Sequence, residues 1–196
     1  MRHSGWPTLC AFAFGKGWAP LLRCPRTSSA SPDAAILHFI TFTCYQRRQL
    51  LASARSKNVA VQILGQVRAK LQFQLIGYVF MPDHVHLLIN EPAGCKPAKV
   101  IQLFKQHVSR KLRARKRTEP SQLSLRFPEN SLPRRLWQRR YYDFNVYSRR
   151  KLREKLDYMH ANPVTEKLVK HPKDWPWSSW SAYVGKPALL SIDFVS

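Results

Sequence analysis

Two histidines separated by one residue, His84 and His86, form the sharpest chemical pattern in the sequence. They fall in the segment 84–90 (HVHLLIN), which has the composition of a β-strand. Side chains two residues apart on a strand point to the same face, so both imidazoles can reach one metal ion, while Val85 and Leu87 point to the other face. The pattern also fits two polar residues on a half-buried strand, so the pair alone does not decide the chemistry.

A tyrosine and an asparagine four residues apart, Tyr158 and Asn162, form a second pattern. On a helix this spacing places both side chains on one face. A tyrosine hydroxyl can attack phosphorus and form a covalent phosphotyrosine, and a carboxamide oxygen is a hard ligand suited to Mg²⁺ or Mn²⁺. Taken alone, Tyr158 is one of seven tyrosines, and Asn162 precedes Pro163, where a helix can end.

Basic residues without acidic partners gather in segment 105–117 and again in 134–140, where aromatic residues stand close by. Basic side chains bind phosphates, and aromatic rings stack on unpaired bases. An ordinary solvated helix face mixes charges of both signs, which this segment does not. We therefore expect nucleic-acid contacts from Lys105, Arg110, Lys111, Arg134, Arg135, Trp137, Arg139, Arg140 and Tyr141.

Seven segments have the periodicity of secondary structure and must position these residues. Strands are predicted at 36–45, 72–80, 84–90 and, less regularly, 136–147, and helices at 53–71, 97–115 and 148–161. The turn 81–83 makes a hairpin of 72–90, residues 116–135 are expected to form a loop, and Asn162-Pro163 is expected to end the last helix. The first six elements follow the β-α-β-β-α-β order of the ferredoxin-like fold. We therefore expect an α+β domain: an antiparallel sheet, helices on one face, and an added C-terminal helix that carries Tyr158.

The two ends of the chain differ from this pattern. Residues 1–35 hold a broken apolar stretch and a linker rich in Pro and Ser, so we expect a poorly ordered extension. The domain is expected over 36–184, because the aromatic residues near its end should pack back on it: Trp175, Trp177, Trp180 and Tyr183. Residues 185–196 are expected to be a tail.

The chain is strongly basic, since 33 Lys and Arg against 11 Asp and Glu give a net charge of +22 over 196 residues. Such a field attracts polyanions. Nucleic acid is the expected partner, with a membrane surface as the competitor. The sequence holds no apolar run of 18 residues, so we expect no membrane-spanning helix and no membrane partner. Four scattered cysteines form no CxxC pair, which disfavours a zinc knuckle and a disulfide framework. We expect a cytoplasmic, nucleoid-associated protein without an organic cofactor.

Four segments, taken in order, resemble the REP-associated tyrosine transposases, a branch of the single-tyrosine transposases with a histidine–hydrophobic–histidine (HUH) signature. The segments are 81–88 (MPDHVHLL), 136–144 (LWQRRYYDF), 158–164 (YMHANPV) and 175–180 (WPWSSW). The resemblance covers residues 36–184. Residues 165–167 (TEK) depart from it, since the family usually carries basic residues and a glycine there.

The resemblance implies a divalent metal, Mg²⁺ or Mn²⁺, bound by His84, His86 and Asn162. It implies that Tyr158 attacks single-stranded DNA beside a hairpin of a palindromic repeat, which gives a 5′-phosphotyrosine and a free 3′-hydroxyl that can later rejoin. It also favours a monomer over a homodimer. Two alternatives stay open: a domesticated, non-catalytic protein that binds DNA or RNA hairpins on the same fold, and an RNA-binding module of unrelated fold that needs neither histidine.

Overall fold

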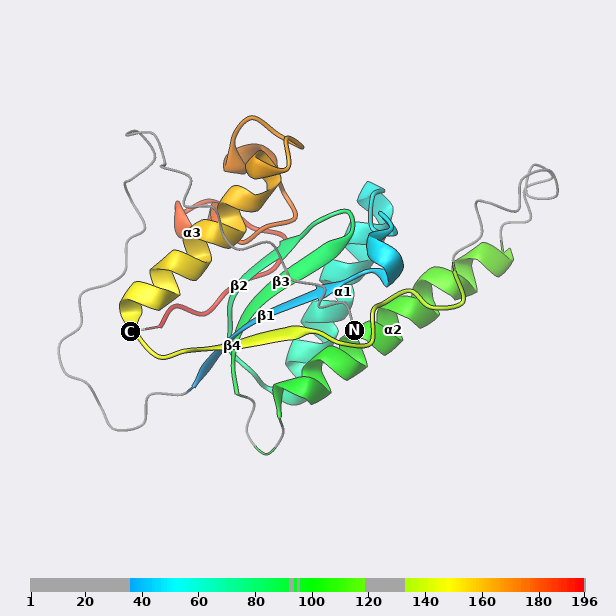
Figure 1. Ribbon diagram of the computed structural model, residues 1–196, viewed down its shortest axis with the longest axis horizontal. Helices are drawn as coiled ribbons and strands as arrows, with labels where there is room; N and C mark the ends of the chain where they lie inside the picture. Colours follow the sequence, from blue (N-terminus) through cyan, green and yellow to red (C-terminus); the bar gives the residue numbers. More distant parts are fainter. Residues whose placement is uncertain (1–35, 92–93, 95, 119–132, 196) are drawn as a thin grey trace, which may run out of the picture.

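The computed structural model describes residues 36–91, 94, 96–118 and 133–195 of the chain. Four strands form an antiparallel sheet: β1 (Leu37–Thr43), β2 (Leu75–Phe80), β3 (His84–Asn90) and β4 (Tyr142–Val146). They lie side by side in the order β2-β3-β1-β4 (Figure 1). The long helices are α1 (Ala54–Leu71), α2 (Pro97–Thr118) and α3 (Arg149–Thr165). The order of elements and strands confirms the predicted α+β, ferredoxin-like fold.

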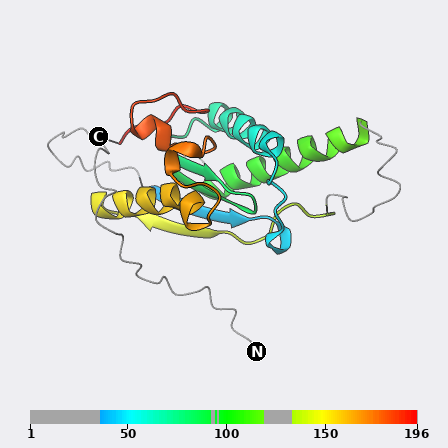
Figure 2. The ribbon, with the colours of Figure 1, turned by 90° about the horizontal axis from the view of Figure 1, so that it is seen from above.

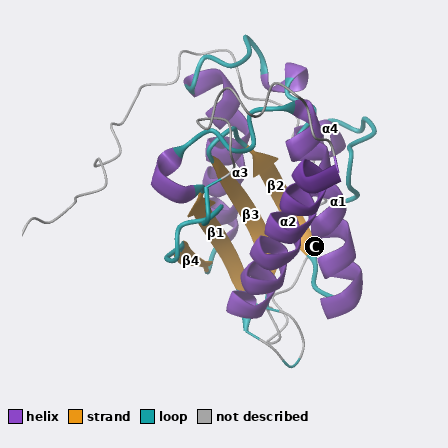
Figure 3. Ribbon diagram, turned by 90° about the vertical axis from the view of Figure 1, so that its right-hand side faces the viewer, coloured by secondary structure: helices purple, strands orange, loops and turns teal. Residues whose placement is uncertain are grey.

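The helices form a layer on each side of the sheet (Figures 2 and 3). α1 and α2 lie together on one face, as predicted for the ferredoxin-like unit, and the added helix α3 covers the other face. The alternation of side chains along β1 explains why both faces are covered. Ile40 and Phe42 belong to the core with α1 and α2, whereas Leu37 and Phe39 belong to the core beneath α3.

The pairing of β1 with β3 brings the two histidines to the layer that contains α3. Thr41 of β1 pairs with His86 of β3. Val85 and Leu87 are buried in the core with α1 and α2, so the side chains of His84 and His86 point to the opposite face. Strand geometry therefore places both imidazoles on the face of the sheet that α3, the helix carrying Tyr158, covers.

α3 does not stop at Asn162-Pro163, and the predicted helix end at 161 is wrong, because the helix ends at Thr165. A proline inside a helix lacks one N–H donor and so costs one hydrogen bond of the ladder. The ladder resumes beyond it, since the N–H of Glu166 donates to the carbonyl of Asn162 at 2.9 Å. Asn162 therefore keeps a helical position, one turn beyond Tyr158.

The segment predicted as a strand over 136–147 forms a strand only at β4. Its first part runs alongside the end of β1 and is joined to Cys44 by an isolated bridge at Trp137. α2 extends past the predicted end at 115 to Thr118. The rest of the predicted loop lies mostly outside the described residues, at 119–132, as does the predicted extension 1–35.

The C-terminal aromatic segment packs on the domain, as predicted. The indole N–H of Trp175 donates to the carbonyl of Phe80 at 3.1 Å, and the hydroxyl of Tyr183 donates to the carbonyl of Ile76 at 2.9 Å. These contacts join the short helices η4 (Pro172–Asp174) and α4 (Trp180–Tyr183) to β2.

The predicted domain boundary at 184 is too early, because the following residues cover the outer edge of β2. The N–H of Asp193 donates to the carbonyl of Leu75 at 2.8 Å, and its carboxylate accepts from the N–H of Leu75 and from Arg68. Covering the edge satisfies strand groups that would otherwise invite pairing with another chain. In the described part of the chain, no helix is both long and apolar enough to cross a membrane.

Candidate active site

The histidines, the asparagine and the tyrosine of the sequence patterns meet between the sheet and α3. Nε2 of His84 lies 3.1 Å from Nε2 of His86, and Nδ2 of Asn162 lies 2.9 Å from the same His86 atom. The ring of Tyr158 stands edge-on to the His86 ring, with the ring centres 5.5 Å apart. One chain supplies all four side chains.

Each imidazole is held through its Nδ1 atom. His84 Nδ1 lies 2.6 Å from Oδ1 of Asp83, and His86 Nδ1 lies 2.8 Å from the hydroxyl oxygen of Thr41. A carboxylate only accepts, so Nδ1 of His84 carries a proton and donates to Asp83. The amide of Asn162 donates to Nε2 of His86, so the proton of a neutral His86 ring lies on Nδ1. Metal-binding histidines are oriented in this way, through the nitrogen that does not bind the metal.

Two observations show that the donors fit a cation. Burial, together with the charges of His84 and Lys155, lowers the pKa of His86 well below its usual value, so this ring is neutral at pH 7. The Nε2 atom of His86 then carries no proton and lies 3.1 Å from Nε2 of His84, so a cation between the two rings would meet both Nε2 atoms. Oδ1 of Asn162 is also buried without a hydrogen-bond partner among the described residues. A half-turn of this amide, which exchanges its nitrogen and oxygen, directs that oxygen to the same point.

The candidate third donor is the carboxamide of Asn162. In the part of the chain that the structure describes, no three His, Cys, Asp or Glu side chains gather as a metal cluster. Two imidazoles and one carboxamide differ from the closed four-ligand sets of structural zinc sites. Such a set would leave further positions of a divalent cation for water or phosphate oxygens.

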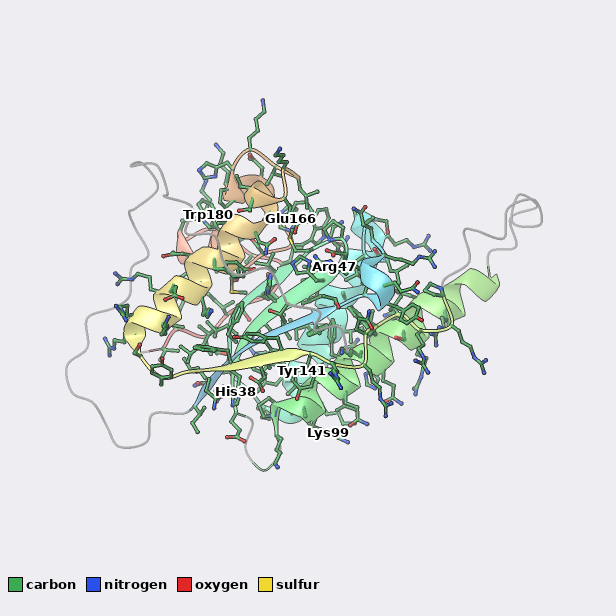
Figure 4. The ribbon with its side chains drawn as sticks, in the orientation of Figure 1. His38, Arg47, Lys99, Tyr141, Glu166 and Trp180 are labelled. Atoms are coloured by element: carbon green, nitrogen blue, oxygen red, sulfur yellow. The ribbon has the colours of Figure 1, made fainter. Side chains whose placement is uncertain are left out.

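Tyr158 is the exposed member of the site, with 42% of its surface accessible. Burial of the rest of the side chain and the charge of Glu166 raise the pKa of its hydroxyl, while Arg47 opposes the shift. The hydroxyl is therefore protonated at pH 7 and must lose its proton before or during an attack. Figure 4 shows Arg47 and Glu166 at the same end of the sheet.

Asp83 lies between His84 and Arg47, a basic residue on the loop after β1. Its Oδ2 atom lies 3.0 Å from Nη2 of Arg47, while its Oδ1 atom faces His84. Burial alone would raise the pKa of Asp83, but the hydrogen bond and charge of His84, with Arg47, lower it below the usual value. Asp83 is therefore ionised and holds the imidazole through a charge-assisted hydrogen bond.

The loop that carries Arg47 has an unusual backbone. In η1 (Tyr45–Arg47), both Gln46 and Arg47 have a φ of 53°, a left-handed conformation that costs a non-glycine residue free energy and often marks functional sites. Sequence reasoning did not identify Thr41, Arg47 or Asp83 as supporting residues. Only the adjacency of Asp83 to His84 could have indicated one of them.

The predicted DNA-contact residues divide into exposed and buried side chains. The exposed ones have side chains open to solvent and available for phosphate: Arg110, Lys111, Arg134, Arg135, Arg139, Arg140 and Tyr141. The prediction for Trp137 is wrong. It is 8% exposed, packs against Phe42 and Phe104, and its indole N–H donates to the carbonyl of Lys105 at 3.1 Å. Its ring is part of the core and has no free face for a base.

Lys105 is half-buried and has internal partners. Its ammonium donates to the carbonyl of Gln138 at 2.9 Å and lies 5.2 Å from the centre of the Phe42 ring. Burial lowers its pKa from 10.5 to about 8. Lys105 therefore holds α2 against the 136–141 segment, a structural role that the sequence analysis did not predict.

Two curated relatives are similar to this chain in sequence. The chain is 24% identical over 156 residues to the REP-associated tyrosine transposase of Escherichia coli K12, which covers 80% of this chain and 82% of the relative. It is 30% identical over 112 residues to a Haemophilus influenzae relative whose name places it with the same transposases, which covers 55% of this chain. The chain spans 59% of the length of that relative.

A solved structure and a family model extend the comparison. The structure of a REP-associated tyrosine transposase bound to a REP hairpin matches with a TM-score of 0.61 and 18% sequence identity, covering 88% of this chain and 94% of the other. At this identity the match shows the shared fold. The family model described as "Transposase IS200 like" matches residues 33–162. The chain therefore belongs to the IS200-like transposase family and is similar to its REP-associated tyrosine transposases.

Proposed function

We propose that this protein is a metal-dependent transposase and endonuclease that cleaves and rejoins single-stranded DNA beside hairpins. The proposal depends on one observation: a half-exposed tyrosine stands against two buried imidazoles whose Nε2 atoms face each other. Family membership supports DNA as the substrate class, and the names of the relatives support a hairpin partner.

His84, His86 and Asn162 would hold the divalent cation, Mg²⁺ or Mn²⁺. When bound, such a cation draws charge from a phosphate oxygen and offsets the negative charge that repels a nucleophile. Asp83 and Thr41 keep the two imidazoles turned toward the same point. Burial of the histidines and of Asn162 keeps solvent from competing on the protein side of the site.

Tyr158 is the nucleophile in this proposal. Its hydroxyl oxygen forms a bond to phosphorus while the bond from phosphorus to the 3′ oxygen breaks. The phenol loses one proton to solvent, which reaches its exposed side, and the departing strand takes up one proton as a 3′-hydroxyl. The 5′ phosphate stays on the tyrosine, and a 3′-hydroxyl attacking in reverse restores the DNA bond without ATP.

A covalent adduct on a denaturing gel tests the proposal. Purified protein is incubated with labelled hairpin oligonucleotides that carry single-stranded flanks, with Mg²⁺ or Mn²⁺ or with EDTA. We expect a metal-dependent adduct from the wild-type chain, none from Tyr158→Phe, and unchanged hairpin binding by that variant. Tyr45→Phe is the matched control, because Tyr45 is a half-buried tyrosine on a different element, η1.

Two outcomes contradict the proposal. An unchanged adduct from Tyr158→Phe removes this tyrosine as the nucleophile. Tight, salt-sensitive hairpin binding by the wild-type chain without any adduct supports the alternative, a non-catalytic hairpin-binding protein on the same fold.

A further inference from the structure

A row of aromatic side chains leads from Tyr158 to the edge of the sheet. Phe39 of β1 meets the Tyr158 ring edge-on, with ring centres 6.1 Å apart. Phe39 is paired with Phe144 in the register of β1 and β4, which brings their side chains together on one face. Phe144 lies beside Tyr142 and Tyr147, at 6.5 Å and 6.2 Å between ring centres. The row thus crosses β1 and ends on β4.

The outer end of this row is open to solvent. Tyr142 is 48% exposed and Tyr147 is 78% exposed, with Phe144 half-buried beside them. The rings of Tyr142 and Phe144 are inclined by only 13° to each other. Exposed rings in a row are the surface on which unpaired bases stack, and such stacking tolerates any base sequence.

A lysine from α3 lies over the middle of the row. Nζ of Lys155 is 4.8 Å from the centre of the Phe144 ring and 5.2 Å from the centre of the Phe39 ring. Lys155 precedes Tyr158 by three residues, so both side chains share a face of α3. An ammonium here can bind a backbone phosphate of a strand whose bases lie on the rings.

We propose that Tyr142, Phe144 and Tyr147 form a stacking platform for the unpaired nucleotides that flank the scissile phosphate, with Lys155 bound to their backbone. The choice of DNA as the occupant rests on the proposed function. The charge of the chain, +22, favours a polyanion over a second copy of the same basic chain. Base stacking is thereby assigned to the α3 face of β4, and not to the buried Trp137.

The experiment measures binding by the full chain carrying Tyr158→Phe, which cannot form the adduct. Fluorescence anisotropy compares a hairpin with a single-stranded extension and the same hairpin with a blunt end. Adding Tyr142→Ala and Tyr147→Ala should weaken binding of the extended hairpin about 5- to 150-fold, the range of one stacked base, and leave the blunt hairpin unchanged. Lys155→Gln should lower the salt dependence of extension binding by about one phosphate contact.

Matched variants separate stacking from folding. Tyr142→Phe with Tyr147→Phe keeps both rings and should keep the affinity. Phe194→Ala removes another exposed aromatic, 53% accessible, beside Tyr183 at the opposite, β2 side of the sheet, and should change neither affinity. Iodouracil placed in the extension should crosslink to Tyr142 or Tyr147 under light.

Three results would overturn the platform. The first is equal binding of the extended hairpin by the double alanine variant. The second is a change in oligomeric state on alanine substitution, which would make the row an interface between chains. The third is a loss of affinity confined to RNA strands. If only the proposed function is wrong, the platform still binds the extended hairpin, but the wild-type chain forms no covalent adduct.

Discussion

The carboxamide of Asn162 places Nδ2 2.9 Å from Nε2 of His86 and leaves Oδ1 buried without a partner in the described part of the chain. A buried oxygen that makes no hydrogen bond costs free energy of folding. This asparagine is therefore poorly explained by packing and well explained by a ligand that its oxygen would meet.

Asn162→Ala should separate metal binding from folding. Without metal, the variant should melt close to the wild-type temperature, because the lost carboxamide had one unsatisfied atom. Mn²⁺ should raise the melting temperature of the wild-type chain by mass action and raise that of the variant much less. Thermal melts with and without Mn²⁺ measure this, with the exposed Asn145→Ala as control. Equal Mn²⁺ shifts in wild type and Asn162→Ala would contradict the assignment.

Asp83→Asn should weaken metal binding about 10- to 100-fold, the usual effect of losing a partner that orients a metal-binding histidine. The change keeps the shape of the side chain but removes the charge that holds His84. Arg47→Ala should have a smaller effect, because the Arg47 side chain is 57% exposed and its ion pair is screened by solvent. Calorimetric titration with Mn²⁺ gives both values, and an unaltered affinity of Asp83→Asn would rule out this orienting contact.

Lys167→Gly should stabilise the protein by about 1 kcal/mol, because Lys167 has a φ of 57° just after α3 and glycine adopts this conformation without strain. The position belongs to the segment 165–167, where the chain departs from the family pattern. Urea denaturation measures the free energy of unfolding. Lys170→Gly, at an exposed position without a positive φ, should give no such gain; a gain at both sites would refute the backbone explanation.

Cys44 should resist alkylation in the native protein. Burial, and then the charge of Asp83, raise the pKa of its thiol to about 12, and only the thiolate reacts. The thiol stays protonated below that pH, so at pH 8 only about one thiol in ten thousand is ionised. Iodoacetamide treatment and peptide mass mapping should find Cys44 unmodified until urea is added. Rapid modification of Cys44 in the native protein would mean that the turn at Asp83 opens locally, because the carbonyl of Asp83 accepts a hydrogen bond from the N–H of Cys44.

The candidate site could be predicted from sequence where its geometry is local. Two residues apart on a strand, or four apart on a helix, side chains share a face whatever the rest of the chain does. This is why His84 with His86, and Tyr158 with Asn162, could be paired before any fold was known. The two pairs meet between the sheet and α3 only because of the whole β-α-β-β-α-β arrangement. The order of the predicted segments indicated that arrangement.

The supporting residues could not be predicted in that way. Thr41 reaches His86 only through the register of β1 and β3, and no local pattern encodes a register between distant strands. Trp137 lies in an extended stretch without periodicity, so nothing in the sequence distinguished its buried ring from the exposed rings nearby.

The helix end at Pro163 was mispredicted for a physical reason. The rule that proline stops a helix counts one lost hydrogen bond, whereas the side chains of Met159 and Pro163 are themselves buried and hold α3 against the sheet. Tertiary packing outweighed the local preference.

A single chain furnishes His84 and His86 from β3 and Tyr158 from α3. If Tyr158 is the nucleophile, dilution should not separate it from the imidazoles, as it would if a second subunit donated the tyrosine. The yield per molecule should hold steady as the protein is thinned far below the concentrations at which weak dimers dissociate. On the proposed function, one copy of the chain would hold both the nucleophile and the metal-binding side chains.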